Sequence, residues 1–379
     1  ERIPRAVGMQ VSANGEGWQV LAPGSRYDIA IEEDLIEELA RIHGYDRIPA
    51  TVPGGPARIV APSEARVDEA DLRRQLVARD YLEAVCFSFV DAGLLEQWQC
   101  SADTVPLANP LSAELAVMRP RLLPGLVAAL ARNVARQAGR VRLFELGRVF
   151  AAADPAQRTP GGPMPAPPET RRIAAVACGD AVAEQWSVPS RKVDFHDLKG
   201  ELESLAAAAG ATLAFRPSAE PFGHPGRSAE VYRTDLETGE VHLGWIGQLH
   251  PRLARALDLD VEVVAFELDL EALEQRALPR AAELSRYPAV RRDLAFVVAE
   301  QVPWSALAAS VRAAAGPVLR DLLLFDRYQG AGIESGCKSL AMGLILQDNT
   351  RTLTDHDADA VVERVVAGLG RDHGARIRG

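Results

Sequence analysis

Apolar side chains recur along the chain in short groups whose spacing predicts helices and strands in three blocks. Residues 31–43 repeat them every three or four positions, which predicts an amphipathic helix with one side formed by Leu35, Leu39 and Ile42. Gly44 then stands where a residue of positive φ commonly ends a helix. Proline and glycine gather around residues 53–56, so we predict that a first domain ends at residue 53.

The second block, residues 61–278, combines helices with many short strands. Helical periodicity predicts helices near 68–79 and 121–137 and a third through 195–205. Alternating or continuous apolar runs predict strands at 84–91, 140–150, 173–178, 213–216, 229–234, 241–248 and 261–268. This order predicts an α+β domain with a mostly antiparallel sheet. Residues 154–169 are rich in proline and glycine, which predicts a surface loop.

The third block, residues 285–379, has the order strand, helix, strand, strand, helix, strand. This order is typical of a ferredoxin-like βαββαβ fold. Strands are predicted at 294–298, 319–328 and 339–347, and Pro303 is expected to open the first helix. Thr354 is expected to cap the second helix, which we predict to end at Gly368 or Gly370.

Composition and charge narrow the class of protein. The 379 residues are 47% hydrophobic and 25% charged, as in globular proteins of two or three domains. A net charge of -10 argues against a chain that coats nucleic acid nonspecifically, although residues 285–379 hold 12 basic against 11 acidic side chains. Apolar runs are too short to cross a membrane and the first residues do not resemble a signal peptide, so we expect a cytoplasmic protein.

The four cysteines and the first residue carry two further expectations. Cys86, Cys100, Cys178 and Cys337 lie far apart without metal-ligand spacing, so we expect reduced thiols. The chain begins at Glu1, without a methionine and inside what reads as a domain, so we expect a fragment of a longer protein.

Three sets of motifs, in order, give the chain a family resemblance. The first is SRYDIAIEEDLIEELARIHGYDRIP. The second comprises NPLSAELAVMRPRLLPGLVAALARNVARQ, RVRLFELGRVF, GHPGRSAEVY and IGQLHP. The third comprises RYPAVRRDLAFVV, FDRYQG, KSLAMGLILQ and RTLTD. Together they resemble the C-terminal portion of the β subunit of bacterial phenylalanyl-tRNA synthetases.

The resemblance implies an α+β, multidomain architecture. Residues 1–53 would be the C-terminal part of a small α/β magnesium-binding domain. Residues 61–278 would be a class II synthetase-like domain without its own catalytic site, and residues 285–379 a ferredoxin-fold anticodon-binding domain. The implied function is to support ATP-dependent attachment of phenylalanine to tRNA-Phe within an α2β2 assembly. Its α subunit performs the catalysis, and ATP is a substrate of that assembly.

Acidic residues near the first predicted helix are candidate metal ligands. Asp34, Glu37 and Glu38 share one helix face, and Asp28 lies just before it. Oxygen donors without His or Cys suit Mg²⁺. An alternative is an exposed acidic face in which Glu37 pairs with Arg41. The resemblance favours the metal, because these four residues fall where the family binds magnesium shared with the α subunit.

The middle block lacks the groups that adenylate formation requires. Class II catalytic domains hold ATP phosphates with arginines of their second and third motifs, and no such third motif is recognisable in this sequence. Arg148 follows a glycine in a strand similar to part of the second motif, and we interpret it as structural. We therefore predict no catalytic residues and an inactive chain when it is alone. A large apolar interface with the α subunit is expected.

The last block offers side chains that could contact RNA by stacking or by binding phosphate. The candidates are Tyr287, Arg291, Arg292, Arg327 and Lys338, with Tyr328 as a further aromatic side chain. The alternative is that the tyrosines lie at the edge of the core while the arginines pair with Asp293 and Asp326.

Two other functions remain open from the sequence. One is a free-standing RNA-binding or scaffolding protein built from the same domains, which would not co-purify with an α subunit. The other is a carboxylate-metal hydrolase centred on the four acidic residues, for which no base or nucleophile is recognisable.

Overall fold

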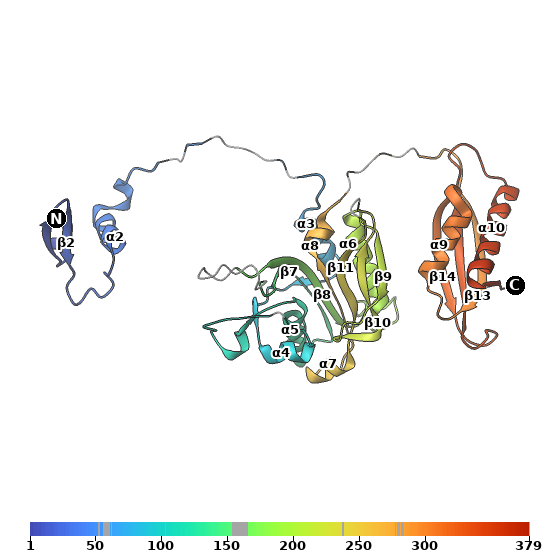
Figure 1. The fold of residues 1–379 in the computed structure, drawn as a ribbon, viewed down its shortest axis with the longest axis horizontal. Coiled ribbons are helices and arrows are strands. Elements are labelled where there is room, and N and C mark those ends of the chain that lie inside the picture. Colours follow the sequence, from blue (N-terminus) through green and yellow to red (C-terminus); the bar gives the residue numbers. More distant parts are fainter. Residues whose placement is uncertain are drawn as a thin grey trace. The chain divides into compact units, whose positions relative to one another are not determined.

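The computed structural model describes residues 1–51, 54–55, 61, 63–102, 104–153, 166–236, 239–276, 278, 281 and 284–378. Its contacts divide the chain into two units, Glu1–Glu64 and Ala65–Gly379, and the second unit holds separate seven-stranded and four-stranded sheets (Figure 1). The predicted boundary at residue 53 and most of the predicted loop at 154–169 lie outside the described residues. No helix in the described part of the chain is long and apolar enough to cross a membrane.

The first unit is a hairpin with two helices. It contains α1 (Arg2–Ala6), β1 (Gln10–Asn14), β2 (Gly17–Leu21), α2 (Glu32–His43) and the short 3-10 helix η1 (Tyr45–Arg47). The predicted helix is confirmed as α2, and Gly44, with φ of 96°, follows its last residue. Among the described residues of this unit only Pro4 and Met9 are buried. The apolar side of α2 is therefore largely open to solvent.

The middle sheet has the order β3-β7-β8-β12-β11-β10-β9. Its strands are β3 (Leu82–Glu83), β7 (Arg140–Phe150), β8 (Glu169–Gly179), β9 (Leu213–Pro217), β10 (Gly223–Arg233), β11 (Val241–Leu249) and β12 (Val263–Asp269). Among the described strands of this sheet, only the pairing of β3 with β7 is parallel, so the predicted mostly antiparallel sheet is confirmed.

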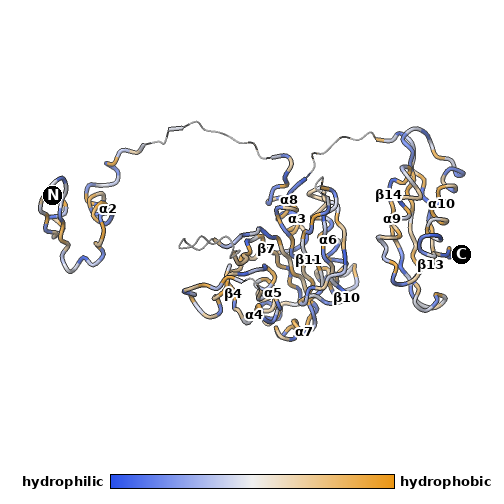
Figure 2. The backbone as a smooth tube through the Cα atoms, viewed as in Figure 1, coloured by the Kyte–Doolittle hydropathy of each residue, from blue (hydrophilic) through white to orange (hydrophobic). Residues whose placement is uncertain are grey.

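Helices cover both faces of this sheet and create two apolar cores (Figure 2). One core lies under α3 (Glu69–Val77), α6 (Phe195–Ala208) and α8 (Leu270–Glu274). The opposite face, called the α5 face below, is covered by α4 (Ala92–Trp98), α5 (Leu123–Ala135) and α7 (Pro251–Ala256). Alternation of side chains along each strand supplies both cores, as expected for a sheet covered on two sides.

The strand predicted at 84–91 is wrong as a single element. The chain leaves β3 after Glu83 and enters a three-stranded sheet through β4 (Phe89–Val90), whose partners are β6 (Val117–Met118) and, beyond it, β5 (Val105–Pro106). Between them the backbone N–H of Cys86 donates to the Glu145 carboxylate, and the carbonyl of Ser88 accepts from Arg119. These tertiary bonds replace a continuous strand ladder.

The last domain is ferredoxin-like, as predicted. Its elements are β13 (Val290–Ala299), α9 (Trp304–Ala315), the 3-10 turn η4 (Gly316–Val318), β14 (Leu319–Tyr328), β15 (Cys337–Leu346), α10 (Asp355–His373) and β16 (Arg376–Ile377). The antiparallel order β14-β15-β13-β16 is that of a βαββαβ fold. Both helices pack on one face through a shared core, and no described helix covers the other face.

Two details of the helix ends differ from the prediction. Thr354 caps α10 as expected, but the helix continues past Gly368 and Gly370 to His373. Gly374, with φ of 63°, then follows the last helical residue. The buried Gly368 lies inside the helix and faces α9, where a Cβ on it would lie 3.5 Å from the Ala314 side chain, so this glycine does not end the helix. Pro303 lies one residue before α9 and not in its first turn.

Candidate functional site

The four predicted metal ligands lie around Arg26 and the start of α2. The Arg26 guanidinium lies 2.7 Å from a carboxylate oxygen of Asp28 and 3.0 Å from one of Glu38. Glu38 also pairs with Arg41 at 2.7 Å, so Arg41 binds Glu38 and not Glu37 as the alternative expected. Hydrogen bonds from Arg26 and Arg41 lower the pKa of Glu38 to about 2. Two arginines therefore neutralise the acidic side chains that face one another.

Asp34 and Glu37 have separate surroundings. The Asp34 carboxylate accepts backbone N–H groups of Ala30 at 2.7 Å and Ile31 at 2.9 Å, which lower its pKa. Glu37 is exposed on the next turn. In the described part of the chain, no three His, Cys, Asp or Glu side chains are placed to hold a metal ion. The residues do not assemble a magnesium site in this arrangement, and the magnesium assignment stays a prediction.

The predicted RNA-binding cations of the last domain are mostly engaged within the protein. Arg292 projects toward the helices, where its guanidinium binds Asp355 at 2.6 Å and Asp359 at 3.0 Å. Arg327 binds Glu300 at 2.9 Å, and the buried Lys338 donates to the carbonyl of the same residue at 2.7 Å. These three cations therefore have neutralising or hydrogen-bonding partners in the free protein.

Two other predicted residues are placed differently. Arg291 lies on the sheet face that no described helix covers, beside Asp293 at 2.7 Å. Tyr287 precedes β13 and is half-buried, and its carbonyl accepts the Gln347 side chain at 2.7 Å. The expected pairing of an arginine with Asp293 therefore occurs, and the expected pairing with Asp326 is replaced by Arg327 with Glu300.

Aromatic rings and arginines meet on the open face of the four-stranded sheet. Arg291 lies over the Phe325 ring at 5.5 Å, and Arg378 lies over the Tyr328 ring at 5.3 Å. Both rings are partly exposed. Phe325 and Arg378 were not among the predicted residues. Alternation along residues 319–328 could have indicated Phe325, but a β-bulge shifts the register of β14 between Leu324 and Asp326.

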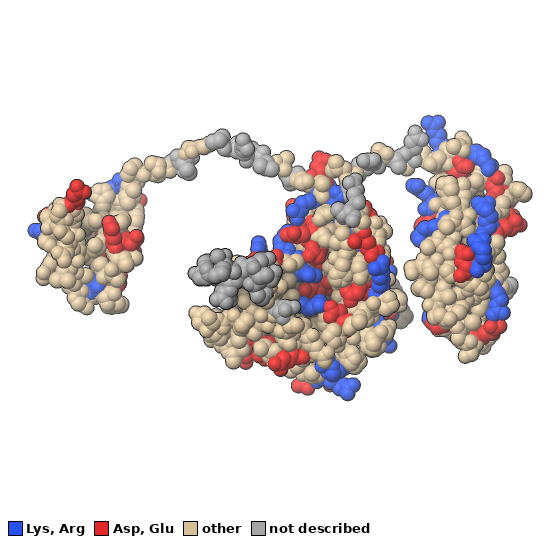
Figure 3. Space-filling model, viewed as in Figure 1, with Lys and Arg blue, Asp and Glu red and all other residues tan. Residues whose placement is uncertain are grey.

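Charges on this domain are interspersed rather than gathered into one basic patch, as the visible face in Figure 3 also shows. Among its described residues, six arginines form ion pairs with carboxylates: Arg291, Arg292, Arg327, Arg351, Arg371 and Arg376. RNA phosphates would have to compete with these internal carboxylates.

The α5 face of the middle sheet holds buried charges that bind one another. Glu145 on β7 and Glu267 on β12 both lie beside Ala174 on β8, which stands between them. Arg119 contacts Glu145 at 2.7 Å, and both side chains are buried. Gly147 provides the space, because a Cβ there would lie 2.4 Å from an Arg119 nitrogen.

Glu267 links this sheet to the start of α5. Its carboxylate accepts the backbone N–H groups of Leu122 at 3.0 Å and Leu123 at 3.1 Å, while burial raises its pKa. The Arg148 side chain is exposed and pairs with Glu169 at 2.5 Å, as fits a structural residue. The charged groups on this face thus serve the fold.

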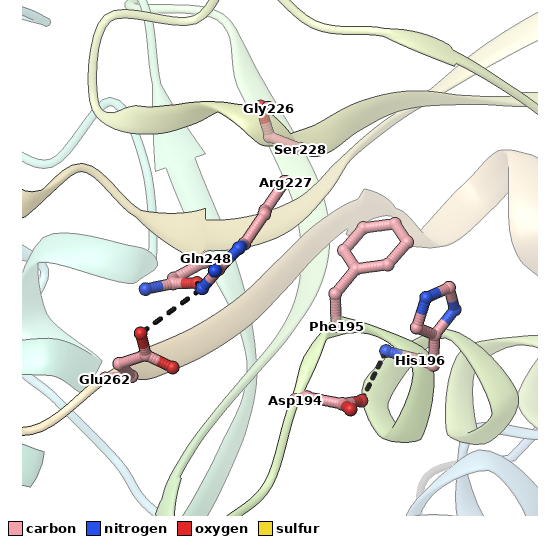
Figure 4. A pocket seen from close by; sticks show the side chains of 8 residues that line it. All are labelled: Asp194, Phe195, His196, Gly226, Arg227, Ser228, Gln248 and Glu262. Atoms are coloured by element: carbon pink, nitrogen blue, oxygen red, sulfur yellow. Dashed lines mark hydrogen bonds and ion pairs between the residues drawn. The ribbon is translucent and has the colours of Figure 1, made fainter. Parts of the chain in front are cut away.

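A pocket of about 500 Å³ opens elsewhere in the middle domain, near the start of α6 (Figure 4). Arg227 crosses it to reach Gln248 at 2.8 Å and Glu262 at 3.2 Å. The Ser228 hydroxyl donates to the His224 carbonyl, and the His196 backbone N–H donates to Asp194. The described residues that line this pocket include polar side chains. Among them, no nucleophile is hydrogen-bonded to a base, as hydrolysis would require.

Large apolar side chains are exposed where the chain leaves the edge strand β3. Val85 is 94% exposed and Phe87 72% exposed, and Leu82 also faces solvent. The residues between them, Ala84 and Cys86, face the α5 core. The segment 82–88 therefore has one apolar side inward and a second apolar side outward, as expected of an interface.

Comparison with known families finds three matches along the chain. Residues 1–45 match the "tRNA synthetase B5 domain", residues 48–270 the "Phenylalanyl tRNA synthetase beta chain CLM domain", and residues 285–378 the "Ferredoxin-fold anticodon binding domain". The phenylalanine–tRNA ligase beta subunits of Xanthomonas campestris pv. campestris (strain 8004), Xanthomonas axonopodis pv. citri (strain 306) and Xylella fastidiosa (strain Temecula1) are 66%, 65% and 60% identical. Each alignment covers all of this chain and 46% of the relative, so the chain spans about half the length of the curated relatives it matches.

Proposed function

Because this chain belongs to the phenylalanyl-tRNA synthetase β-chain family, we propose that it supports ATP-dependent attachment of phenylalanine to tRNA-Phe within an assembled enzyme. In this proposal an α subunit binds ATP and carries out the chemistry, in an α2β2 assembly in the cytoplasm. The chain contributes a class II-like middle domain for assembly and an anticodon-binding domain for the tRNA.

The buried ion pair on the α5 face is the observation that carries the non-catalytic role. Catalysis on ATP requires cations free to meet phosphate charge in the transition state. Arg119 is instead enclosed with Glu145, and the start of α5, which could have met an anion, is taken by Glu267. If Arg119 turned to bind a phosphate, Glu145 would be left as a buried, unpaired charge. Nucleotide binding on this sheet face would therefore cost free energy.

The apolar side of segment 82–88 supports assembly with a second polypeptide. Burying Val85 and Phe87 would each gain about 1.5–3 kcal/mol by the usual transfer values. Such side chains seldom stay exposed together on a monomeric protein. An α subunit with a matching apolar surface is the partner that the family membership suggests.

The open sheet face of the last domain supports contact with the anticodon region. Phe325 and Tyr328 offer rings for base stacking, and Arg291 and Arg378 already lie over those rings. Each stacked base is worth about 1–3 kcal/mol. With 12 basic against 11 acidic side chains, this domain binds RNA weakly alone and gains affinity from the rest of the assembly.

A charging assay tests the proposal. The chain alone should form no phenylalanyl adenylate, measured by pyrophosphate exchange, whereas the chain purified together with an α subunit should yield aminoacylated tRNA-Phe. Phe87→Asp should reduce recovery of the complex, and Leu284→Asp, at an exposed position outside segment 82–88, is the comparison. Adenylate formation by the chain alone would contradict the proposal. Persistent RNA binding without any α partner would favour a free-standing RNA-binding protein.

A further inference from the structure

Trp186 is the most conspicuous exposed apolar side chain of the middle domain. It is 97% exposed, whereas Trp98 and Trp245 of the same domain are fully buried. Val182 and Val188 are exposed in the same loop, which connects β8 to α6. Exposing a tryptophan forfeits one of the largest apolar contributions a side chain can make, so its position calls for a partner.

The loop that carries Trp186 is held by hydrogen bonds at both ends and at its tip. At the base, the N–H of Ala181 donates to the carbonyl of Arg191 at 2.9 Å, and Lys192 pairs with Asp180 at 2.9 Å. At the tip, the Gln185 side-chain oxygen accepts the N–H of Ser187 at 2.9 Å and its hydroxyl at 2.6 Å. The ring is therefore presented on an ordered support, which lowers the entropy lost on docking.

Two arginines of β7 join this loop to the apolar edge of the sheet. Arg140 donates to the Asp180 carbonyl at 3.2 Å and pairs with Asp80, two residues before Leu82, at 3.1 Å. Arg142 donates to the Ala181 carbonyl at 2.8 Å. The loop and the exposed Leu82 are thus attached to the same strand end, and a partner bound along segment 82–88 can extend to the loop.

The charges of the loop argue against a nucleic-acid partner. Lys192 is paired with Asp180, and Arg191 binds Asp197 through two hydrogen bonds of 2.5 and 2.6 Å. Glu184 is exposed and has no ion pair among the described residues. Phosphate binding needs unpaired cations, whereas an apolar pocket with a basic rim would complement Trp186 and Glu184.

We propose that the loop 180–192 is a docking arm whose Trp186 ring inserts into an apolar, basic-rimmed pocket on the α subunit. This inference rests on the assembly proposed above and extends its contact surface from segment 82–88 to a second, tryptophan-centred anchor. Tryptophan is enriched among the few interface residues that carry most of the binding energy.

Affinity measurements on the chain and an α subunit test this anchor. Trp186→Ala should weaken the complex by about 30-fold or more, the effect of a binding hot spot, without changing the thermal unfolding of the free chain. Leu284→Ala is the control, because it truncates an apolar side chain that is 88% exposed and lies outside both segment 82–88 and the loop 180–192. Subtracting the fluorescence spectrum of Trp186→Phe from that of the wild type isolates the Trp186 emission. This emission should shift to shorter wavelength when the α subunit binds.

The outcomes separate the inference from the proposed function. If Phe87→Asp weakens the complex but Trp186→Ala does not, the assembly stands and the docking arm is wrong. If Leu284→Ala weakens the complex as much as Trp186→Ala, the loop has no special role. If Trp186→Ala changes only self-association, measured by sedimentation, the occupant is a second copy and the inference is overturned. If wild type binds no α subunit, both proposals fall.

Discussion

Many charged side chains in this protein meet a counter-charge from the same chain, and some of these partners are far away in the sequence. Arg26 lies between Asp28 and Glu38, Arg119 is enclosed with Glu145, and Arg292 reaches across to α10. The exposed ion pairs add little to the free energy of unfolding. Their importance is that they decide which charges remain available to a metal ion or to RNA.

Arg26 is expected to limit metal binding at the first unit. Arg26→Ala would leave Asp28 and Glu38 facing each other without this cation, so the variant should bind Mg²⁺ several-fold more tightly than wild type in calorimetry. Arg47→Ala, on an exposed residue of η1, should behave as wild type. Absence of Mg²⁺ binding in both wild type and Arg26→Ala would remove the four acidic residues from consideration as ligands.

Glu267 is expected to make the stability of the middle domain depend on pH. Its pKa in the folded protein is raised above the ordinary 4.5 by burial, so its contribution is complete at low pH and is lost as pH rises through the folded pKa. Urea unfolding followed by the buried Trp98 and Trp245 should show this component of stability falling as pH rises above 4.5. Glu267→Gln keeps an acceptor for α5 and should abolish this component.

Two further variants complete this test. Glu169 is the matched carboxylate, because it is exposed and pairs with Arg148, so Glu169→Gln should keep the pH dependence. Glu267→Ala should cost about 1–3 kcal/mol for each of the two N–H groups it leaves without an acceptor. Equal pH dependence in wild type and Glu267→Gln would contradict the assignment.

Most helices and strands form where local sequence patterns predict them, whereas the position at which a helix ends can depend on tertiary packing. Thr354 and Asp68 cap the helices that the sequence predicts there, because their side chains bond nearby N–H groups regardless of the rest of the fold. Gly368 or Gly370 was expected to end α10, but the helix continues past both, and Gly368 lies inside it against α9. Local signals alone could not distinguish a glycine that ends a helix from one that packs against a neighbour.

Replacing a glycine by alanine should therefore have opposite effects on the free energy of unfolding inside α10 and just after it. At Gly368 a Cβ would make an ordinary 3.5 Å contact with Ala314, so Gly368→Ala should raise the free energy of unfolding by about 0.5–1 kcal/mol. At Gly374 the φ of 63° disfavours a side chain, so Gly374→Ala should destabilise by about 1 kcal/mol. Denaturant unfolding of the two variants measures the difference, and a helix that truly ended at Gly368 would not be stabilised by alanine there.

At the scale of the whole molecule, binding depends on which surfaces the folded domains leave open. In the last domain the helices take one sheet face, so Arg292 is directed toward α10 and Arg291 toward the open face. Neighbours in sequence therefore have different roles. Because the helices cover only one sheet face, Phe325 and Tyr328 on the other face remain accessible for base stacking.

Salt dependence of tRNA binding should separate these two arginines in the assembled enzyme. Arg291→Ala should lower the slope of log affinity against log salt by about 1, as expected for one lost phosphate contact. Arg292→Ala should leave that slope unchanged, because its guanidinium lies on the helix-covered side between Asp355 and Asp359, whereas Arg291 has one carboxylate partner on the open face. Filter binding across a salt series measures both slopes, and a larger effect of Arg292→Ala would place the RNA on the helix-covered side.

The sequence by itself determined the elements whose signals are local: the helix of residues 32–43, the strands of the middle sheet other than β3, and the βαββαβ order of the last domain. It also determined the family, because three ordered sets of motifs extend along the chain. Only the tertiary structure decided which charges are neutralised and which rings are exposed. Glu267 reaches an N–H group 145 positions earlier, and the Trp186 ring is exposed although tryptophan is a residue type that proteins usually bury. Such outcomes depend on distances between segments far apart in the sequence, which periodicity and composition do not contain.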